Sequence, residues 1–244
     1  MARTPEGARL TQQHRATQRR IRALVMRRVQ NLWPLLDPAD ITSTERAWMA
    51  ATIDAINAGR QLSARAAVRY YEAFRLAEGG GGAAPLRLAG PVSNAQAVAS
   101  LHVTGPGRLL RAAGRGDVAA SSKGLSGVLG SAARLALAGG RESLAAMIAA
   151  DSAASGYARV AGGGACAFCA MLASRGPVYS TDVEFDPPDN CDCSVEAVIG
   201  GEAGYGWPPN SRAFQRQWEQ AGSLNELRRL RTANATAAVA APAA

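Results

Sequence analysis

All four cysteines of this 244-residue chain lie within one stretch of 28 residues, CAFCAMLASRGPVYSTDVEFDPPDNCDC. Cys166 and Cys169 form a C-x-x-C pair, and Cys191 and Cys193 form a C-x-C pair after a gap of 21 residues. This spacing allows both pairs of thiolates to reach one tetrahedral ion. The sequence therefore predicts a metal site of four cysteines. We expect Zn²⁺ in a structural role, because four protein ligands leave no position for a reactive water.

Other states of the four thiols fit the same spacing. Two disulfides are one alternative and reduced, unliganded thiols are another, although clustered cysteines in a reducing compartment more often bind metal. A redox pair of the thioredoxin type would need a βαβ context around Cys166 and Cys169, and the sequence does not predict one.

Hydrolytic chemistry would need a nucleophile beside a base, and the chain offers few candidates. The histidines are His14, in a basic segment where an exposed side chain is expected, and His102, at a helix end where capping or packing is the simpler interpretation. Ser122 adjoins Lys123, the only lysine, but neighbours at i and i+1 on a helix do not face each other. His102, Ser122 and Lys123 are thus candidate catalytic residues without a G-x-S-x-G or H-E-x-x-H motif to support them. Whether the protein is an enzyme stays open at this point.

Composition favours closely packed helices. Apolar residues make up 48% of the chain but aromatic residues only 5%, and alanine supplies much of the apolar total. We expect a mainly α fold with a minor β part. The net charge of +8 comes almost entirely from arginine, which suits phosphate or carboxylate partners but can also reflect a GC-rich genome. No window approaches 18 continuous apolar residues, so we expect a soluble protein that is not exported.

Helical periodicity and turn residues divide the chain into elements. The predicted helices cover residues 12–33, 42–59, 63–78, 94–103, 117–138, 141–151, 211–220 and a basic segment around 228–231, and the predicted strands cover 157–160 and 194–199. Gly59 and the Gly139-Gly140 pair are interpreted as helix breaks. We expect three parts: a helical body with a basic N-terminal helix (1–152), a cysteine-rich β and loop module (153–205), and C-terminal helices with a disordered alanine-rich tail (206–244).

A longer, ordered set of motifs surrounds the cysteines. The run GYARVAGGGACAFCAMLASRGPVY, followed by the C-x-C pair, resembles the core of a family of minor head proteins from tailed phages of actinobacteria. These are called MuF-like minor capsid proteins and are often labelled capsid maturation proteases. The resemblance extends to LWPLL at 32–36, Y-Y-x-A-x-R-x-A-E at 70–78, A-G-P at 89–91 and L-H-V-T-G-P at 101–106. It covers most of residues 30–195.

The resemblance implies a head-morphogenesis protein that acts in procapsid assembly near the portal, with a capsid maturation protease as the alternative. Its partners would be portal, capsid or scaffold proteins, with packaged DNA contacted through the arginine-rich helices, and no membrane. It would be located in the host cytoplasm during assembly and then in the procapsid or virion.

One position pair departs from the family pattern. Members usually carry histidines in a His-x-His-Cys-x-Cys arrangement, whereas this chain has Pro188 and Asn190 at the two histidine positions. If a histidine is a ligand in relatives, then Asp186, Asp189 or the complete set of four cysteines must replace it here.

Overall fold

The computed structural model of the protein describes residues 2–180, 185, 187–191, 193–200, 206–208 and 210–240, without the side chains of 234–240. Its fold is mainly helical with one small sheet, as the composition predicted. The elements in chain order are α1 (Pro5–Leu32), η1 (Trp33–Leu35), α2 (Ile41–Ala77), α3 (Asn94–Thr104), α4 (Pro106–Ala113), α5 (Ala120–Ala150), β1 (Ala154–Val160), α6 (Ala167–Ala173), β2 (Ser194–Ile199), α7 (Ser211–Ala221) and α8 (Leu224–Ala240).

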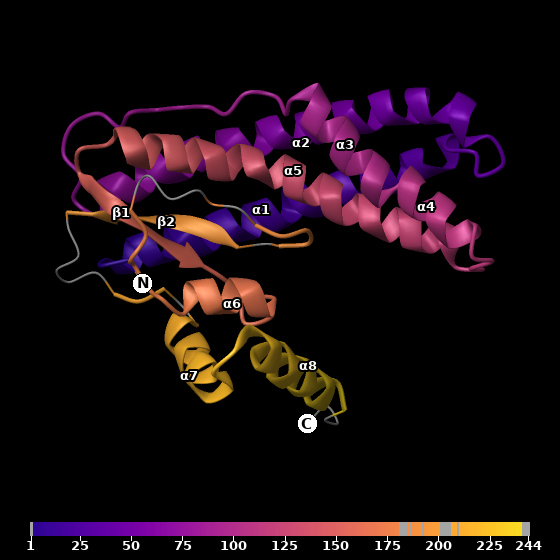
Figure 1. Cartoon of the computed structure of the whole chain (residues 1–244). Coiled ribbons are helices and arrows are strands. Elements are labelled where there is room, and N and C mark those ends of the chain that lie inside the picture. Colours follow the sequence, from indigo (N-terminus) through magenta and orange to yellow (C-terminus); the bar gives the residue numbers. More distant parts are fainter. Residues whose placement is uncertain are drawn as a thin grey trace.

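The long helices α1, α2 and α5 pack lengthwise and form the body of the molecule, with α3 and α4 against one end of α5 (Figure 1). Their contact faces carry the apolar stripes predicted from the sequence, since Val25, Val29, Trp48 and Ile56 are buried. The aromatic stripe near the end of α2, which includes Phe74, is buried as well. Across the described residues, none of the helices combines the length and apolar character that crossing a membrane requires.

Two predicted helix breaks are wrong, because the glycines involved serve helix packing. Both α2 and α5 are continuous, so Gly59 and the Gly139-Gly140 pair lie inside helices. A Cβ atom at Gly59 would clash with Val25 of α1, and one at Gly139 would clash with the backbone carbonyl of Arg60 in α2. The absence of a side chain at these positions lets the three long helices approach closely.

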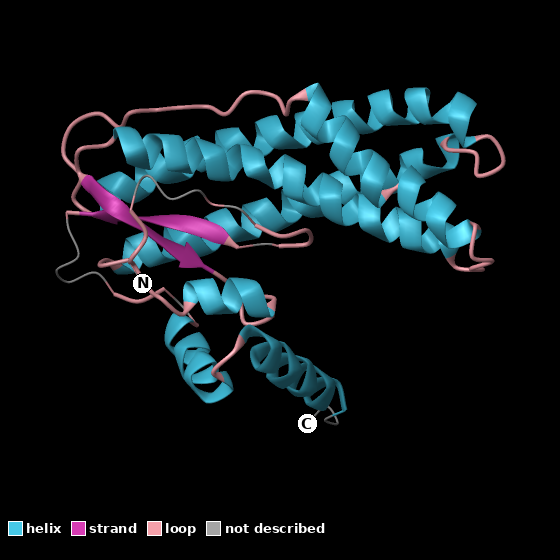
Figure 2. Ribbon diagram, in the orientation of Figure 1, coloured by secondary structure: helices cyan, strands magenta, loops and turns pink. Residues whose placement is uncertain are grey.

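Two strands form an antiparallel ribbon at the other end of the bundle (Figure 2). The predicted range 194–199 is confirmed, whereas β1 begins three residues before the predicted 157. Val160 pairs with Ser194 at the end of the ribbon where the chain leaves β1 for α6. This pairing brings the segment before β2 beside α6, although the two are distant in sequence.

The C-terminal helices pack on α6 rather than on the long bundle (Figure 1). Arg228 and Arg229 are exposed. Arg231 instead turns inward, because it donates hydrogen bonds to the carbonyl of Ala165 at 2.6 and 3.0 Å and stacks over Phe214 at 5.0 Å. The helix α8 also continues to Ala240, into the alanine-rich segment that was predicted to be disordered.

Candidate metal centre

A short helix positions the first cysteine pair. Cys166 is the N-cap of α6, with extended backbone angles, and its Sγ accepts a hydrogen bond from the N–H of Cys169 at 3.4 Å. Cys169 lies in the first turn and is buried, whereas Cys166 is exposed. The sequence predicted loop here, because α6 spans only seven residues and is too short for a clear periodic pattern.

A tight turn positions the second pair. The N–H of Cys191 bonds to the carbonyl of Pro188 at 3.3 Å, and Asn190 within this turn takes a left-handed φ of 63°. The Asn190 side chain rests against α5 at Gly130, where a Cβ atom would lie 2.7 Å from its amide nitrogen. The N–H of Cys193 then bonds to Cys191 Sγ at 3.3 Å, immediately before β2 begins. Thus α5 supports the turn and β2 fixes its exit.

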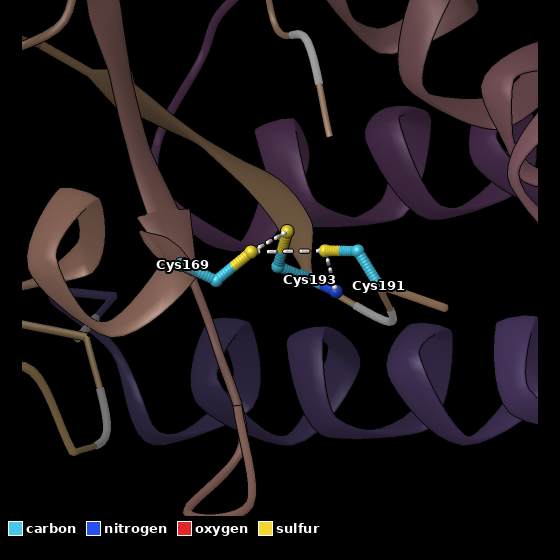
Figure 3. Close-up of side chains that lie close together, drawn as sticks. All are labelled: Cys169, Cys191 and Cys193. Carbon is cyan, nitrogen blue, oxygen red and sulfur yellow. Dashed lines mark hydrogen bonds between the residues drawn. The ribbon is translucent and has the colours of Figure 1, made fainter. Parts of the chain in front are cut away.

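Three of the four sulfurs meet in the interior (Figure 3). Cys169 Sγ lies 3.1 Å from Cys191 Sγ and 3.6 Å from Cys193 Sγ. All three ligand atoms lie within 4.8 Å of one another, and all three residues are buried. The group combines the two cysteine pairs, which approach from α6 and from the segment before β2.

Cys166 does not belong to this compact group, but it faces the same space. A cavity of about 180 Å³ is lined by Cys166, Cys169 and Cys191, together with Asp189 and Asn190. Asp189 accepts a hydrogen bond at 2.7 Å from Arg134 of α5, so its carboxylate is already paired. Pro188, at the first family histidine position, offers no ligand atom, and Asp186 lies outside the described residues.

The donor set suits a thiophilic metal ion. Sulfurs bound tetrahedrally to Zn²⁺ at about 2.3 Å stand roughly 3.8 Å apart, and the observed separations of 3.1 and 3.6 Å are close to this value. They far exceed the roughly 2.05 Å of a disulfide, and all four cysteines are free. The three buried cysteines could therefore hold a metal ion.

The local electrostatics favour thiolates at two positions. A hydrogen bond from the Cys169 thiol lowers the pKa of Cys166 to about 6. The thiols of Cys169 and Cys191 hold the pKa of Cys193 well below its ordinary value of 9.0, and the guanidinium groups of Arg141 and Arg159 lower it further. No motif in the sequence points to these two arginines.

The structure places the candidate catalytic residues apart from the cysteines, and each has another partner. His102 Nδ1 is 2.6 Å from Glu45 Oε1. Ser122 donates a hydrogen bond to the carbonyl of Ala119 at 2.9 Å, and Lys123 pairs with Asp117 at 2.5 Å. Among the described residues, no hydrogen bond or ion pair joins the three to one another.

The residues of the Y-Y-x-A-x-R-x-A-E motif have structural roles that the sequence did not reveal. Arg75 and Tyr71 both bond to the buried carboxylate of Asp151, which ends α5, at 2.5 and 2.8 Å. Glu78 accepts the backbone N–H groups of Arg3 and Thr4 at 2.8 and 3.1 Å. The motif therefore ties the end of α2 to the end of α5 and to the start of α1.

The fold is a bundle of long helices that carries a small module built around cysteine. The chain matches the family described as VG15 protein over residues 7–221 and belongs to that family, which is a family of viral proteins. No curated protein matches the chain, and no solved structure does. Because the matched range runs from α1 to the end of α7, the bundle and the cysteine module are parts of one family unit.

Proposed function

We propose that the protein is a minor head protein of a tailed phage and that it acts in procapsid assembly, close to the portal. Membership of a viral family carries this proposal, because the match covers residues 7–221 and so includes nearly the whole fold. The ordered motifs between residues 30 and 195 support it, since they resemble minor head proteins of actinobacterial phages.

The charged surface suggests the kind of partner. Arg19, Arg20 and Arg27 are exposed on α1, and Arg228 and Arg229 are exposed on α8. Guanidinium groups bind carboxylates and phosphates with paired hydrogen bonds. The proposed partners are therefore acidic surfaces of portal, capsid or scaffold proteins, with packaged DNA as a further partner.

Zn²⁺ has a structural part in this proposal. Cys169, Cys191 and Cys193 would hold the ion, with Cys166 as the fourth candidate ligand because it faces the adjoining cavity. The bound ion would supply coordination bonds that join α6 to the C-x-C turn and so stabilise the module.

Genetic complementation tests the role in assembly. A phage that lacks this gene would be grown with the wild-type chain or with Cys169→Ser supplied in trans. We expect fewer filled heads without the chain, the wild-type chain in purified procapsids by mass spectrometry, and weak incorporation of the variant. Proteins that co-purify would identify the partner, and loss of the chain after nuclease treatment would indicate DNA. Normal heads without the chain, and its absence from procapsids, would contradict the proposal.

The protease alternative has its own readout in the same material. Mass spectrometry of the capsid protein would reveal a trimmed terminus, which we do not expect to depend on this chain. Ser122→Ala and His102→Ala would be compared with Ser152→Ala, an exposed serine just after the end of α5 that serves as the control. Trimming that disappears in either of the first two variants but persists in the control would establish proteolysis.

A further inference from the structure

Two buried arginines lie beside the cysteine centre. Arg141 comes from α5 and Arg159 from β1, and they are 5% and 3% exposed. Arg141 donates hydrogen bonds from Nη2 to the carbonyl of Cys191 at 2.8 Å and from Nε to the carbonyl of Cys193 at 3.2 Å. A single side chain of the long bundle thus holds both cysteines of the C-x-C pair by their backbone.

Arg159 contacts the cysteine centre indirectly, by way of an aromatic ring. Its guanidinium carbon lies 3.8 Å from the ring centroid of Phe185, and that of Arg141 lies 5.6 Å from the same centroid. Phe185 in turn packs against the apolar cluster that contains Cys169, Cys191 and Cys193. Both guanidinium groups therefore lie near the Phe185 ring, which packs against the cysteine cluster.

These charges lack full compensation from hydrogen bonds. Nη1 of Arg141 and both Nε and Nη1 of Arg159 are buried and have no hydrogen-bond partner among the described residues. Buried charge is costly unless an opposite charge lies near. The buried Glu196 projects from the opposite face of the ribbon, since it pairs with Ala158 while Arg159 pairs with Val195. On that opposite face, Thr11 donates a hydrogen bond to Glu196 at 2.5 Å.

The cysteine centre can supply the opposite charge. A divalent cation bound by three or four thiolates is an anionic centre, and such a centre would balance two guanidinium groups. We propose that Arg141 and Arg159 are outer positioning residues of the metal centre, where Arg141 fixes the C-x-C backbone and both residues balance the charge of the metal-bound thiolates. The inference rests on the proposed metal centre and adds the residues that set its affinity.

Metal affinity of the full-length protein tests this assignment. Zn²⁺ binding would be measured by competition with a chromophoric chelator, and Co²⁺ absorption would report the number of thiolate ligands. We expect Arg141→Met and Arg159→Met to weaken Zn²⁺ binding by about 10- to 100-fold, the usual effect of removing outer partners of metal ligands. Arg141→Lys should recover part of the loss, because it keeps the charge and one hydrogen-bond donor.

A buried arginine elsewhere provides the matched control. Arg60 is also 5% exposed, and it bonds to Gly90, Leu135 and Glu142 instead of the cysteine centre. Arg60→Met should lower thermal stability yet leave Zn²⁺ affinity unchanged. Circular dichroism would monitor folding throughout, and Arg159→Gln, which also removes the charge, would replace Arg159→Met if that variant does not fold.

The possible results separate the two proposals. Wild-type protein that binds Co²⁺ through thiolates, together with unchanged affinity in the variants at 141 and 159, would overturn the outer-residue assignment and leave the metal centre in place. Wild-type protein that binds neither Zn²⁺ nor Co²⁺ would overturn both. Equal losses in the variants at 60, 141 and 159 would assign the effect to general destabilisation and would also overturn the inference.

Discussion

At the scale of single residues, His14 differs most from its expected state. It was expected to be exposed in a basic segment, but it is 5% exposed and stacks on Tyr70 with ring centroids 4.4 Å apart. Burial lowers the pKa of His14 from its ordinary value of 6.5 to about 3. The side chain is therefore neutral at physiological pH and acts as part of the contact between α1 and α2.

The depressed pKa of His14 predicts a loss of stability in mild acid. The unfolded chain takes up a proton near pH 6.5, whereas the folded chain does so only near pH 3. The contribution of the buried neutral imidazole to the free energy of unfolding is thus complete above pH 6.5. It is lost as the pH falls below this value, by up to about 1.4 kcal/mol per pH unit. His14→Phe, which keeps an aromatic ring, should lose about 2 kcal/mol less than wild type between pH 7.5 and 5. Urea unfolding at both pH values measures this, and equal losses in the two proteins would refute the assignment.

At the scale of elements, the glycines of α2 and α5 show how the long helices fit together. Gly139 faces the backbone of Arg60, and backbone cannot move aside as a flexible side chain can. An alanine there would improve intrinsic helix propensity by up to about 1 kcal/mol. It would also force two helices apart, and this packing cost is the larger effect.

We therefore expect Gly139→Ala to lower the free energy of unfolding by about 1–3 kcal/mol, the usual range for overpacking. Gly81→Ala is the matched control, because a methyl group at that position would meet nothing within 4 Å. Urea denaturation of the two variants measures the difference. A Gly139→Ala protein as stable as wild type would mean that the helix contact tolerates a methyl group.

At the scale of the whole molecule, the cysteine centre connects the long bundle to the C-terminal helices. Phe214 of α7 belongs to the same apolar cluster as Cys169, Cys191 and Cys193. Arg231 of α8 bonds to the carbonyls of Gly163 at 2.7 Å and Ala165 at 2.6 Å, just before Cys166. The bundle of α1, α2 and α5 has its own core, which does not include these residues.

Metal removal should consequently affect one part of the molecule first. After treatment with a strong chelator, we expect amide hydrogens in α6, α7 and α8 to exchange faster, while those in the centres of α2 and α5 stay protected. Arg231→Ala should increase exchange in α8 without reducing the zinc content. Hydrogen exchange read by mass spectrometry measures both effects. Simultaneous loss of protection in α5 and α7 on chelation would show a single cooperative unit instead.

Local patterns in the sequence determined many of the helices and which of their faces are buried. The stripe that includes Val25 and Val29 and the aromatic residues near the end of α2 follow from helical periodicity, because the period shows which face of a helix must be buried. The predicted helix start at residue 94 also depends on a local contact, because the hydroxyl of Ser93 accepts the N–H of Gln96 at 3.2 Å. The cysteine spacing likewise predicted two pairs that converge.

Other features depended on which elements meet. The predicted start of a helix at residue 42 is one residue late, because Asp40 caps α2 and its side chain accepts the N–H of Ser43 at 3.3 Å. The start of α1 at Pro5 was missed because its first turns are mostly polar and because the Glu78 carboxylate that anchors Thr4 lies 74 residues away. A polar segment has no apolar period, so its sequence does not predict a contact with a residue far along the chain.

The candidate metal site also has features that follow from the sequence and features that follow only from the tertiary structure. The sequence by itself determined that four thiols lie close along the chain and which two pairs they form. Only the tertiary structure decided that Cys169, Cys191 and Cys193 are buried together, that Cys166 stays at the rim, and that two arginines from α5 and β1 adjoin them. The physical reason is that spacing limits how far apart ligands can be, whereas burial and charge depend on neighbours that packing brings from elsewhere in the chain.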